Sequence, residues 1–206
     1  MIAPPPLAAT STVTERPAGV RERLLEAALQ VLASEGIHAL TQVRVADRAG
    51  LRQSHLTYYF PTRTELLQAI VVHVAGEGPG MVKGDTDSLP PTLSALKAHL
   101  GDRITDVRMA RVMLALTTAS DEDPSLKRWM VEFDEQMRDM FGALLASMGY
   151  QCSPLEIALF HATMVGTAVL HSSEGTEDSA REARTLVGIA FDRLVATATN
   201  VNGRQS

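Results

Sequence analysis

The chain lacks most features that mark secreted, membrane-spanning or disulfide-stabilised proteins. Its 206 residues contain one cysteine, Cys152, so no internal disulfide can form, and a reducing cytosol is the expected environment. No run approaches the roughly 20 apolar residues that a membrane helix needs. The first residues lack the charged and apolar regions of a secretory signal. We therefore expect a cytoplasmic protein that makes no contact with a membrane.

Signatures of β-structure and of catalysis are missing as well. No segment has the pattern of a strand, and no Gly-x-Ser-x-Gly nucleophile motif occurs. The glycines of residues 76–80 lack the adjacent Gly-Lys pair of a phosphate-binding loop. The spacing of His161 and His171 does not place them on one helix face, as zinc ligands would be. We expect no enzyme, no cofactor and no metal.

The net charge of −5 is unevenly distributed along the chain. Residues 1–70 contain 7 Lys and Arg against 6 Asp and Glu, whereas residues 71–206 contain 12 against 18. The segment 41–63 is the most basic, with four arginines and a single acidic residue. A small basic patch on an acidic body fits a protein that binds DNA through one limited surface.

Helical spacing of apolar residues, separated by caps and breakers, predicts an all-α fold of about nine helices. Four are expected in the first part of the chain, at about 20–35, 41–49, 52–59 and 62–75. Five longer ones are expected at about 92–101, 104–119, 124–148, 154–173 and 178–199.

The same pattern divides the chain into domains. Residues 1–17, rich in Pro, Ala and Thr, predict a flexible arm, and residues 18–75 predict a small DNA-binding domain with a connecting helix. A Gly- and Pro-rich loop follows at 76–91. Residues 76–206 form the second predicted domain.

Residues 41–59 have the spacing of a helix-turn-helix. Ala46 is small where the two helices must cross closely, and Gly50 can adopt the left-handed backbone of the turn. The remaining apolar positions would pack both helices onto residues 20–32, and they are Val45, Ala49, Leu51, Leu56 and Tyr59.

The second helix of such a unit lies in the major groove of DNA. The side chains that we expect to face the bases are Arg52, Gln53, Ser54, His55 and Tyr58. Arg can donate two hydrogen bonds to guanine, and Gln can pair with adenine. The predicted phosphate contacts come from Tyr58, Tyr59, Arg63 and Thr41, and Arg44 of the basic patch completes the DNA-binding set.

The same segment resembles the DNA-binding domain of the tetracycline-repressor (TetR) family. The resemblance covers about residues 20–70 and is carried by the run Leu40-Thr41, Val45-Ala46, Ala49-Gly50-Leu51, Leu56, Tyr59-Phe60, Arg63 and Leu66-Leu67. The departures from the family pattern are Arg52 for Ser, Ser54 for Gly, Thr57 for Tyr and Arg63 for Lys.

The resemblance implies a ligand-binding and dimerisation domain after residue 76, in which the last two helices of each subunit pair with their twins. The side chains expected at this dimer interface are Phe160, Met164, Thr167, His171, Leu186, Ile189 and Arg193. An ordinary intramolecular core is the alternative role for these residues. Two recognition helices set about 34–36 Å apart would bind a palindromic DNA operator.

Seven of the nine methionines lie between residues 109 and 164, close to aromatic side chains. Flexible thioethers suit an adaptable apolar pocket. The predicted ligand-binding residues are Met109, Met113, Leu116, Trp129, Phe133 and Met137, with His99 and His161 as polar contacts. Core packing is the alternative role for each of them.

These predictions describe a homodimeric repressor that a small, largely apolar molecule releases from its operator. An activator fits the same sequence. A different class remains open: a helical ligand-binding protein whose N-terminal unit no longer binds DNA, as the Thr57 and Arg52 departures and the acidic balance allow.

Overall fold

A computed structural model describes residues 19–76 and 92–200, so the predicted arm at 1–17 lies outside the described residues. Nine α-helices dominate these ranges, which confirms the all-α prediction. The N-terminal part contains α1 (Val20–Glu35), a 3-10 turn η1 (Ile37–Ala39), α2 (Gln42–Ala49), α3 (Gln53–Tyr59) and α4 (Arg63–Gly76). The C-terminal part contains α5 (Leu93–Ile104), α6 (Val107–Ser120), α7 (Pro124–Ser147), α8 (Pro154–Glu174) and α9 (Glu177–Thr197).

Two details differ from the sequence prediction. The break between α5 and α6 falls at Thr105–Asp106, further along than expected, because the Asp106 carboxylate accepts a hydrogen bond from the Arg108 N–H and caps α6. Two short antiparallel strands, β1 (Tyr150–Gln151) and β2 (Thr199–Asn200), were not predicted. Strands of two residues are too short to produce a recognisable alternation.

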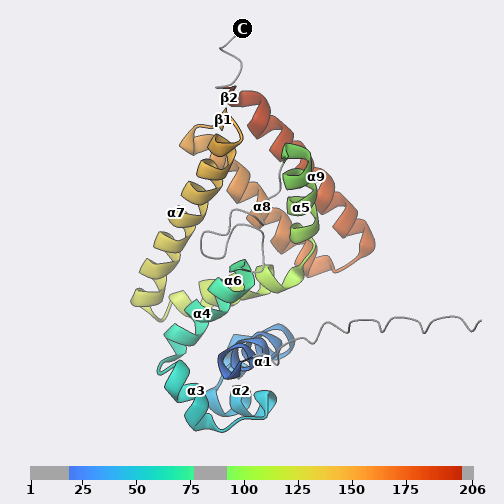
Figure 1. The fold of residues 1–206 in the computed structure, drawn as a ribbon. Helices are drawn as coiled ribbons and strands as arrows, with labels where there is room; N and C mark the ends of the chain where they lie inside the picture. Colours follow the sequence, from blue (N-terminus) through green and yellow to red (C-terminus); the bar gives the residue numbers. More distant parts are fainter. Residues whose placement is uncertain (1–18, 77–91, 201–206) are drawn as a thin grey trace, which may run out of the picture.

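In the N-terminal part, α2 and α3 cross each other and pack against α1 (Figure 1). Thr41 begins α2, since its hydroxyl accepts a hydrogen bond from the Arg44 N–H at 3.3 Å. Gly50 ends α2 in the left-handed region, at φ 63°, and its N–H bonds to carbonyls of the last turn. The Arg23 guanidinium ties α1 to this turn by donating to the Ala49 carbonyl at 2.8 Å.

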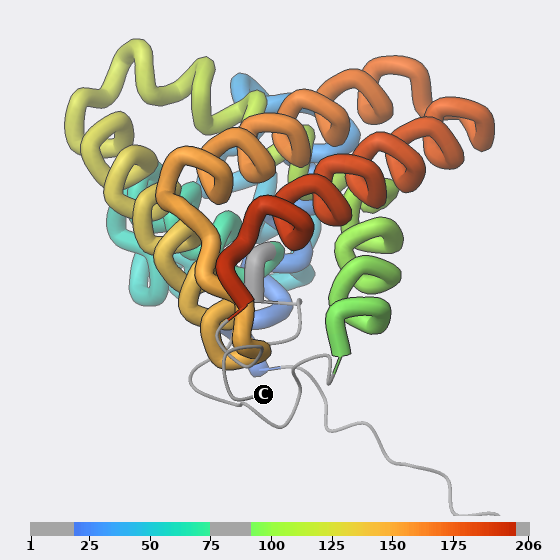
Figure 2. Tube along the Cα trace, turned by 90° about the horizontal axis from the view of Figure 1, so that it is seen from above, coloured from blue at the N-terminus to red at the C-terminus, as the bar shows by residue number. Residues whose placement is uncertain are grey.

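In the C-terminal part, α8 and α9 form an antiparallel pair, with α5 lying along α9 and α7 along α8 (Figures 1 and 2). Their core contains a cluster of aromatic rings. The Phe160 ring stacks on Phe141 at 5.2 Å between centroids and meets Phe191 edge-on at 6.0 Å. A capping box begins α8, in which the Ser153 and Glu156 side chains each accept a hydrogen bond from the other residue's backbone N–H.

A second apolar core joins the two parts, with α6 lying between the N-terminal helices and the rest (Figure 1). Leu116 of α6 and Leu126 of α7 are buried in the same cluster as Leu29 of α1 and Ile70 of α4. Three hydrogen bonds run across the same boundary. The N-terminal unit is therefore held in a defined orientation on the second domain.

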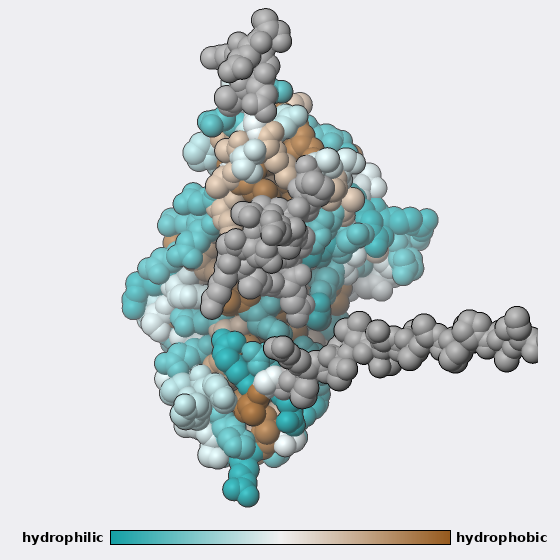
Figure 3. Space-filling model, viewed as in Figure 1, coloured by the Kyte–Doolittle hydropathy of each residue, from teal (hydrophilic) through white to brown (hydrophobic). Residues whose placement is uncertain are grey.

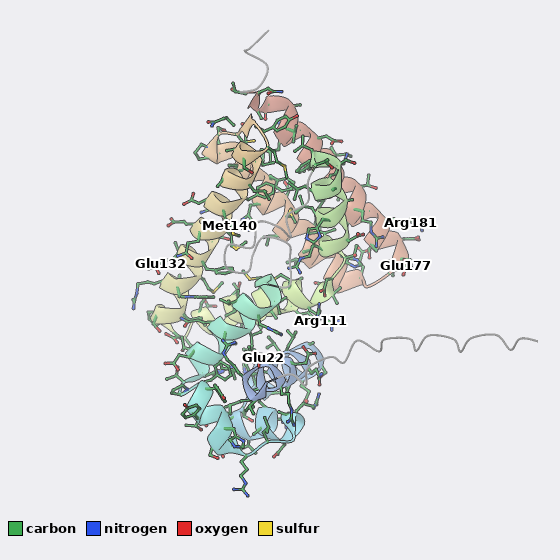
Figure 4. All side chains as sticks on the ribbon, viewed as in Figure 1. Glu22, Arg111, Glu132, Met140, Glu177 and Arg181 are labelled. Atoms are coloured by element: carbon green, nitrogen blue, oxygen red, sulfur yellow. The ribbon has the colours of Figure 1, made fainter. Side chains whose placement is uncertain are left out.

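In each of these three hydrogen bonds the donor is a side chain. The Arg111 guanidinium of α6 donates to the Ala33 carbonyl of α1 at 3.1 Å, and Figure 4 shows Arg111 on the side of α6 toward α1. Arg103 donates to the Val74 carbonyl at 3.1 Å. The Thr64 hydroxyl of α4 donates to the Asp123 carboxylate at 2.5 Å.

Asp123 also caps α7, because its carboxylate accepts hydrogen bonds from Ser125 and from the Leu126 N–H. The bonds from Ser125 and Thr64 lower the pKa of Asp123 from its ordinary value. A carboxylate whose pKa is lowered on folding stabilises the native state above its unfolded pKa of about 3.9, and this stabilisation is lost as the pH falls through the native pKa.

We predict that Asp123→Asn destabilises the protein at pH 7 and that the difference from the wild type shrinks in acid. Urea denaturation followed by circular dichroism, at pH 7 and at stepwise lower pH, measures both quantities. Asp121→Asn, an exposed carboxylate two residues away, is the matched control and should show no such change. A deficit for Asp123→Asn that stays constant with pH would contradict the prediction.

The left-handed backbone at Gly50 should make the replacement of this glycine by other residues unfavourable. Any Cβ there has room, since its nearest neighbour would be Arg23 at 3.7 Å, so the cost is conformational. Gly50→Ala should lower the free energy of unfolding by about 1 kcal/mol, and Gly50→Asn by less, because Asn tolerates this conformation. Equal losses for both variants in urea denaturation would refute the assignment of the turn.

Candidate DNA interface and sensing region

Helix α3, which is predicted to lie in the major groove of DNA, presents almost all of its side chains to solvent. Within it only Leu56 is buried, and it packs into the core shared with α1. The five side chains predicted to face bases are all exposed, namely Arg52, Gln53, Ser54, His55 and Tyr58. Tyr58 is 79% exposed, and its ring meets the Tyr59 ring edge-on at 5.1 Å between centroids, so the two rings lie side by side on the exposed face of α3.

The basic residues around α3 are partly engaged within the protein. Glu35, the last residue of α1, pairs with Arg44 at 2.5 Å and Arg48 at 2.8 Å. One N–H of the Arg63 guanidinium donates to the Ile37 carbonyl at 2.9 Å. Arg52 occupies the N-cap position of α3 without a side-chain cap bond. Glu35, a residue that was not predicted to belong to the basic patch, therefore holds two of its four arginines.

The side chains of two glutamines form a hydrogen bond that the sequence did not predict. Gln42 and Gln53 are the first residues of α2 and α3, and the Gln53 amide nitrogen donates to the Gln42 amide oxygen at 3.1 Å. A depression of about 410 Å³ lies beside Gln42, with Thr41, Gln42 and Arg63 among its lining residues. Two predicted DNA-contacting residues at the starts of α2 and α4, Thr41 and Arg63, thus line one depression.

The predicted ligand-binding residues are divided between several places. Leu116 is buried, and Met109, Met113, Trp129 and Phe133 are half-buried against the core that joins the two domains. Trp129 and Phe133 stack at 5.1 Å between ring centroids. These five residues therefore pack at the domain junction, next to α1 and α4, and their contact with a ligand stays a prediction.

The other three predicted ligand contacts lie away from that junction cluster. Met137 is half-buried on α7. His161 of α8 faces Asp134 of α7 at 3.5 Å, and the same carboxylate pairs with Arg138 at 2.9 Å. Burial lowers the pKa of His99, and nearby Arg103 lowers it further, against the opposing effect of Asp102. A neutral His99 side chain can both donate and accept a hydrogen bond.

A further methionine, Met140, lies on α7 beyond Met137. Figure 4 shows Met140 on the inner side of α7, toward the space between α7 and α5, whereas Glu132 points outward. Residues 77–91, part of the predicted loop, lie outside the described residues.

Some residues predicted to lie at the dimer interface are buried in the structure, and others are exposed. Phe160, Thr167 and His171 are buried inside the protomer, which fits the intramolecular core role that the sequence left open for them. Phe160 belongs to the aromatic cluster, and the His171 ring bonds the Ser179 hydroxyl at 2.8 Å between α8 and α9. A side chain that is covered by its own chain cannot contact a second copy.

An apolar face does remain exposed on the same two helices. Figure 2 shows α8 and α9 together on one side of the molecule. On α9 the exposed residues include three that were predicted, Leu186, Ile189 and Arg193, and on α8 they include Leu155, Leu159 and Leu170, which were missed. Met164 is half-buried. Periodicity alone identified both helices but not which of their faces is covered.

α8 is, by length and composition, apolar enough to cross a membrane, which the sequence analysis did not anticipate. Only 22% of its most apolar window is buried within the protomer. The other side of the molecule, in Figure 3, is mainly hydrophilic with small apolar areas. The exposed leucines of α8 thus form an apolar surface on a protein whose face in Figure 3 is mainly hydrophilic.

In the unit formed by α1, α2 and α3, the exposed helix α3 follows α2 after a glycine turn. This arrangement defines the helix-turn-helix class. Residues 24–70 match the family model described as bacterial regulatory proteins of the tetR family. The match is to the N-terminal domain model of this family, and the chain as a whole has the fold of solved TetR-family transcription regulators. The suspected resemblance is therefore confirmed.

Solved structures support the fold over most of the chain. A transcriptional regulator from Rhodococcus sp. Rha1 has 22% identity and a TM-score of 0.67, covering 86% of this chain and 96% of its own. A TetR transcription regulator from Haloarcula marismortui has 16% identity and a TM-score of 0.64, covering 85% and 98%.

A third structure is the multidrug binding protein EbrR complexed with imidazole, with 24% identity and a TM-score of 0.57, covering 86% of this chain and 96% of its own. No curated protein matches the chain.

Proposed function

We propose that this protein is a ligand-responsive transcriptional repressor that binds a palindromic operator as a homodimer in the cytoplasm. The observation that carries the proposal is the exposed face of α3, held on α1 by Leu56 and aimed by the Gly50 turn. Side chains at the start of such a helix reach base edges in the major groove. An activator would use the same interface.

Gel-shift titration of the purified protein against the DNA flanking its own gene tests this proposal directly. The affinity should fall steeply with salt, because each neutralised phosphate releases counterions. A helical ligand-binding protein that no longer binds DNA is the rival. A folded protein that binds no palindromic site at any salt concentration would establish that rival.

Two variants separate the roles of the exposed side chains. Tyr58→Phe removes a hydroxyl expected to contact phosphate, so it should weaken all sites alike, whereas Arg52→Ala should change the base preference. Selection from a library of operator variants measures both effects. Arg63→Ala is unsuitable as a pure phosphate probe, since Arg63 also bonds the Ile37 carbonyl. Equal losses of specificity from both variants would refute this division.

The dimer is proposed to form through the exposed apolar residues of α8 and α9. Burying Leu155, Leu159, Leu170 and Ile189 against a twofold copy would remove their apolar surface from water. The twofold axis of such a dimer would relate two recognition helices, one for each half-site of the palindrome.

We predict that the double variant Leu159→Arg and Leu170→Arg is monomeric and loses affinity for the palindrome. Sedimentation velocity measures the first effect and gel shift the second. Val131→Arg, at an equally exposed apolar position on α7, is the matched control and should remain dimeric. A dimeric double variant would place the interface elsewhere.

The effector is proposed to be a small, largely apolar molecule bound in the C-terminal domain. The methionines of α6 and α7 and the multidrug binding of the structurally similar EbrR support this choice. The junction core supplies a route for its effect, because α6 contacts α1 and α4 directly. A ligand releases DNA only by its difference in affinity for the two spacings of the recognition helices.

A further inference from the structure

The bond between Gln42 and Gln53 connects the starts of the two helices that approach DNA. Gln42 is the first residue of α2 and half-buried, and Gln53 is the first residue of α3 and exposed. The first helix of a helix-turn-helix crosses the phosphate backbone, whereas the start of the second reaches base edges. The pair therefore spans the boundary between a backbone-contacting and a base-contacting position.

This bond fixes which polar atoms Gln53 has left for DNA. A glutamine amide has two N–H donors and one acceptor oxygen. One N–H of Gln53 is used on the Gln42 oxygen at 3.1 Å, which leaves the other N–H and the carbonyl oxygen. One donor beside one acceptor is the pattern that matches N7 and N6 of adenine in the major groove.

The backbone around the pair is also constrained. The hydroxyl of Thr57, one turn further along α3, donates to the backbone carbonyl of Gln53 at 3.2 Å. Thr41 caps α2 immediately before Gln42. Both glutamines therefore start from fixed helix ends. Holding a flexible side chain in its bound arrangement reduces the entropy that binding must otherwise remove.

We propose that Gln42 is a positioning residue that orients the Gln53 amide to recognise one adenine in each half-site. The proposal rests on the DNA binding proposed above. Gln42 keeps both of its own N–H groups, and at the start of α2 these can donate to a phosphate oxygen. The Gln42 contact with phosphate would then fix the position of the protein along the DNA, and the Gln53 contact would recognise the base.

Selection of bound duplexes from a random library by the full-length protein tests the pair. The wild type should select adenine at one position of each half-site, and Gln53→Ala should abolish that preference. Gln42→Ala and Gln42→Met should each reduce it on the order of fivefold or more, since a bidentate contact discriminates bases at least that strongly. Because the two residues act as a unit, the double variant should lose no more than Gln53→Ala alone.

Two further variants distinguish positioning from mere stabilisation. Gln42→Glu still offers an acceptor to Gln53, so the adenine preference should persist although the added negative charge lowers affinity for every site. Gln30→Ala removes an exposed glutamine of α1 that bonds Glu26, and it should change nothing. Melting temperatures near that of the wild type verify that each variant folds.

Several results would overturn the proposal. An unchanged adenine preference in Gln42→Met would show that Gln53 needs no partner. Selection of guanine at this position would mean that Gln53 presents two donors, with the bond reversed. In both cases the wild type still selects a specific sequence, so the proposed function survives. A wild type that selects no sequence would instead remove the proposed function and this inference together.

Discussion

The rest of the structure depends on the apolar packing of α6 against α1 and α4. That contact buries Leu116 among residues of both N-terminal helices and makes the small helix-turn-helix part of a larger core. A unit of three short helices buries little surface by itself, and short helices gain most of their stability from packing. The same contact sets the direction in which α3 points from the body.

The packing at this junction also limits what the proposed effector could change on binding. Met109, Met113, Trp129 and Phe133 contact the junction core from the C-terminal side, and Arg111 and Asp123 bond to the N-terminal helices across it. Close-packed interiors transmit small displacements because they cannot absorb them. A side chain that shifts on α6 or α7 therefore acts on helices whose orientation positions α3.

The proposed DNA-facing surface combines a helical scaffold with side chains held by short polar contacts. Glu35 holds Arg44 and Arg48, Ile37 holds Arg63, and Gln42 holds Gln53. Exposed ion pairs of this kind contribute little to stability. Their effect is to restrict the positions from which charged and amide groups can meet DNA, which favours specificity over general attraction to phosphate.

Sequence reasoning was most successful where the physical cause is local. The left-handed Gly50, the Thr41 and Ser153 caps and the helical periods each depend on a few neighbouring residues, so the helices and the turn could be predicted. The break before α6 was misplaced because Asp106 acts as a cap without a distinctive pattern around it. The two-residue strands depend on chain segments that meet only in the fold.

By itself the sequence determined the fold class, the helix-turn-helix and the side chains exposed on α3, because periodicity, caps and one glycine specify these features. Only the tertiary structure decided which side of each long helix is covered. It buried Phe160, Thr167 and His171 inside the protomer, left the leucines of α8 exposed, and brought Gln42 to Gln53. A helical period identifies an apolar stripe, but which neighbour covers that stripe depends on how distant segments pack together.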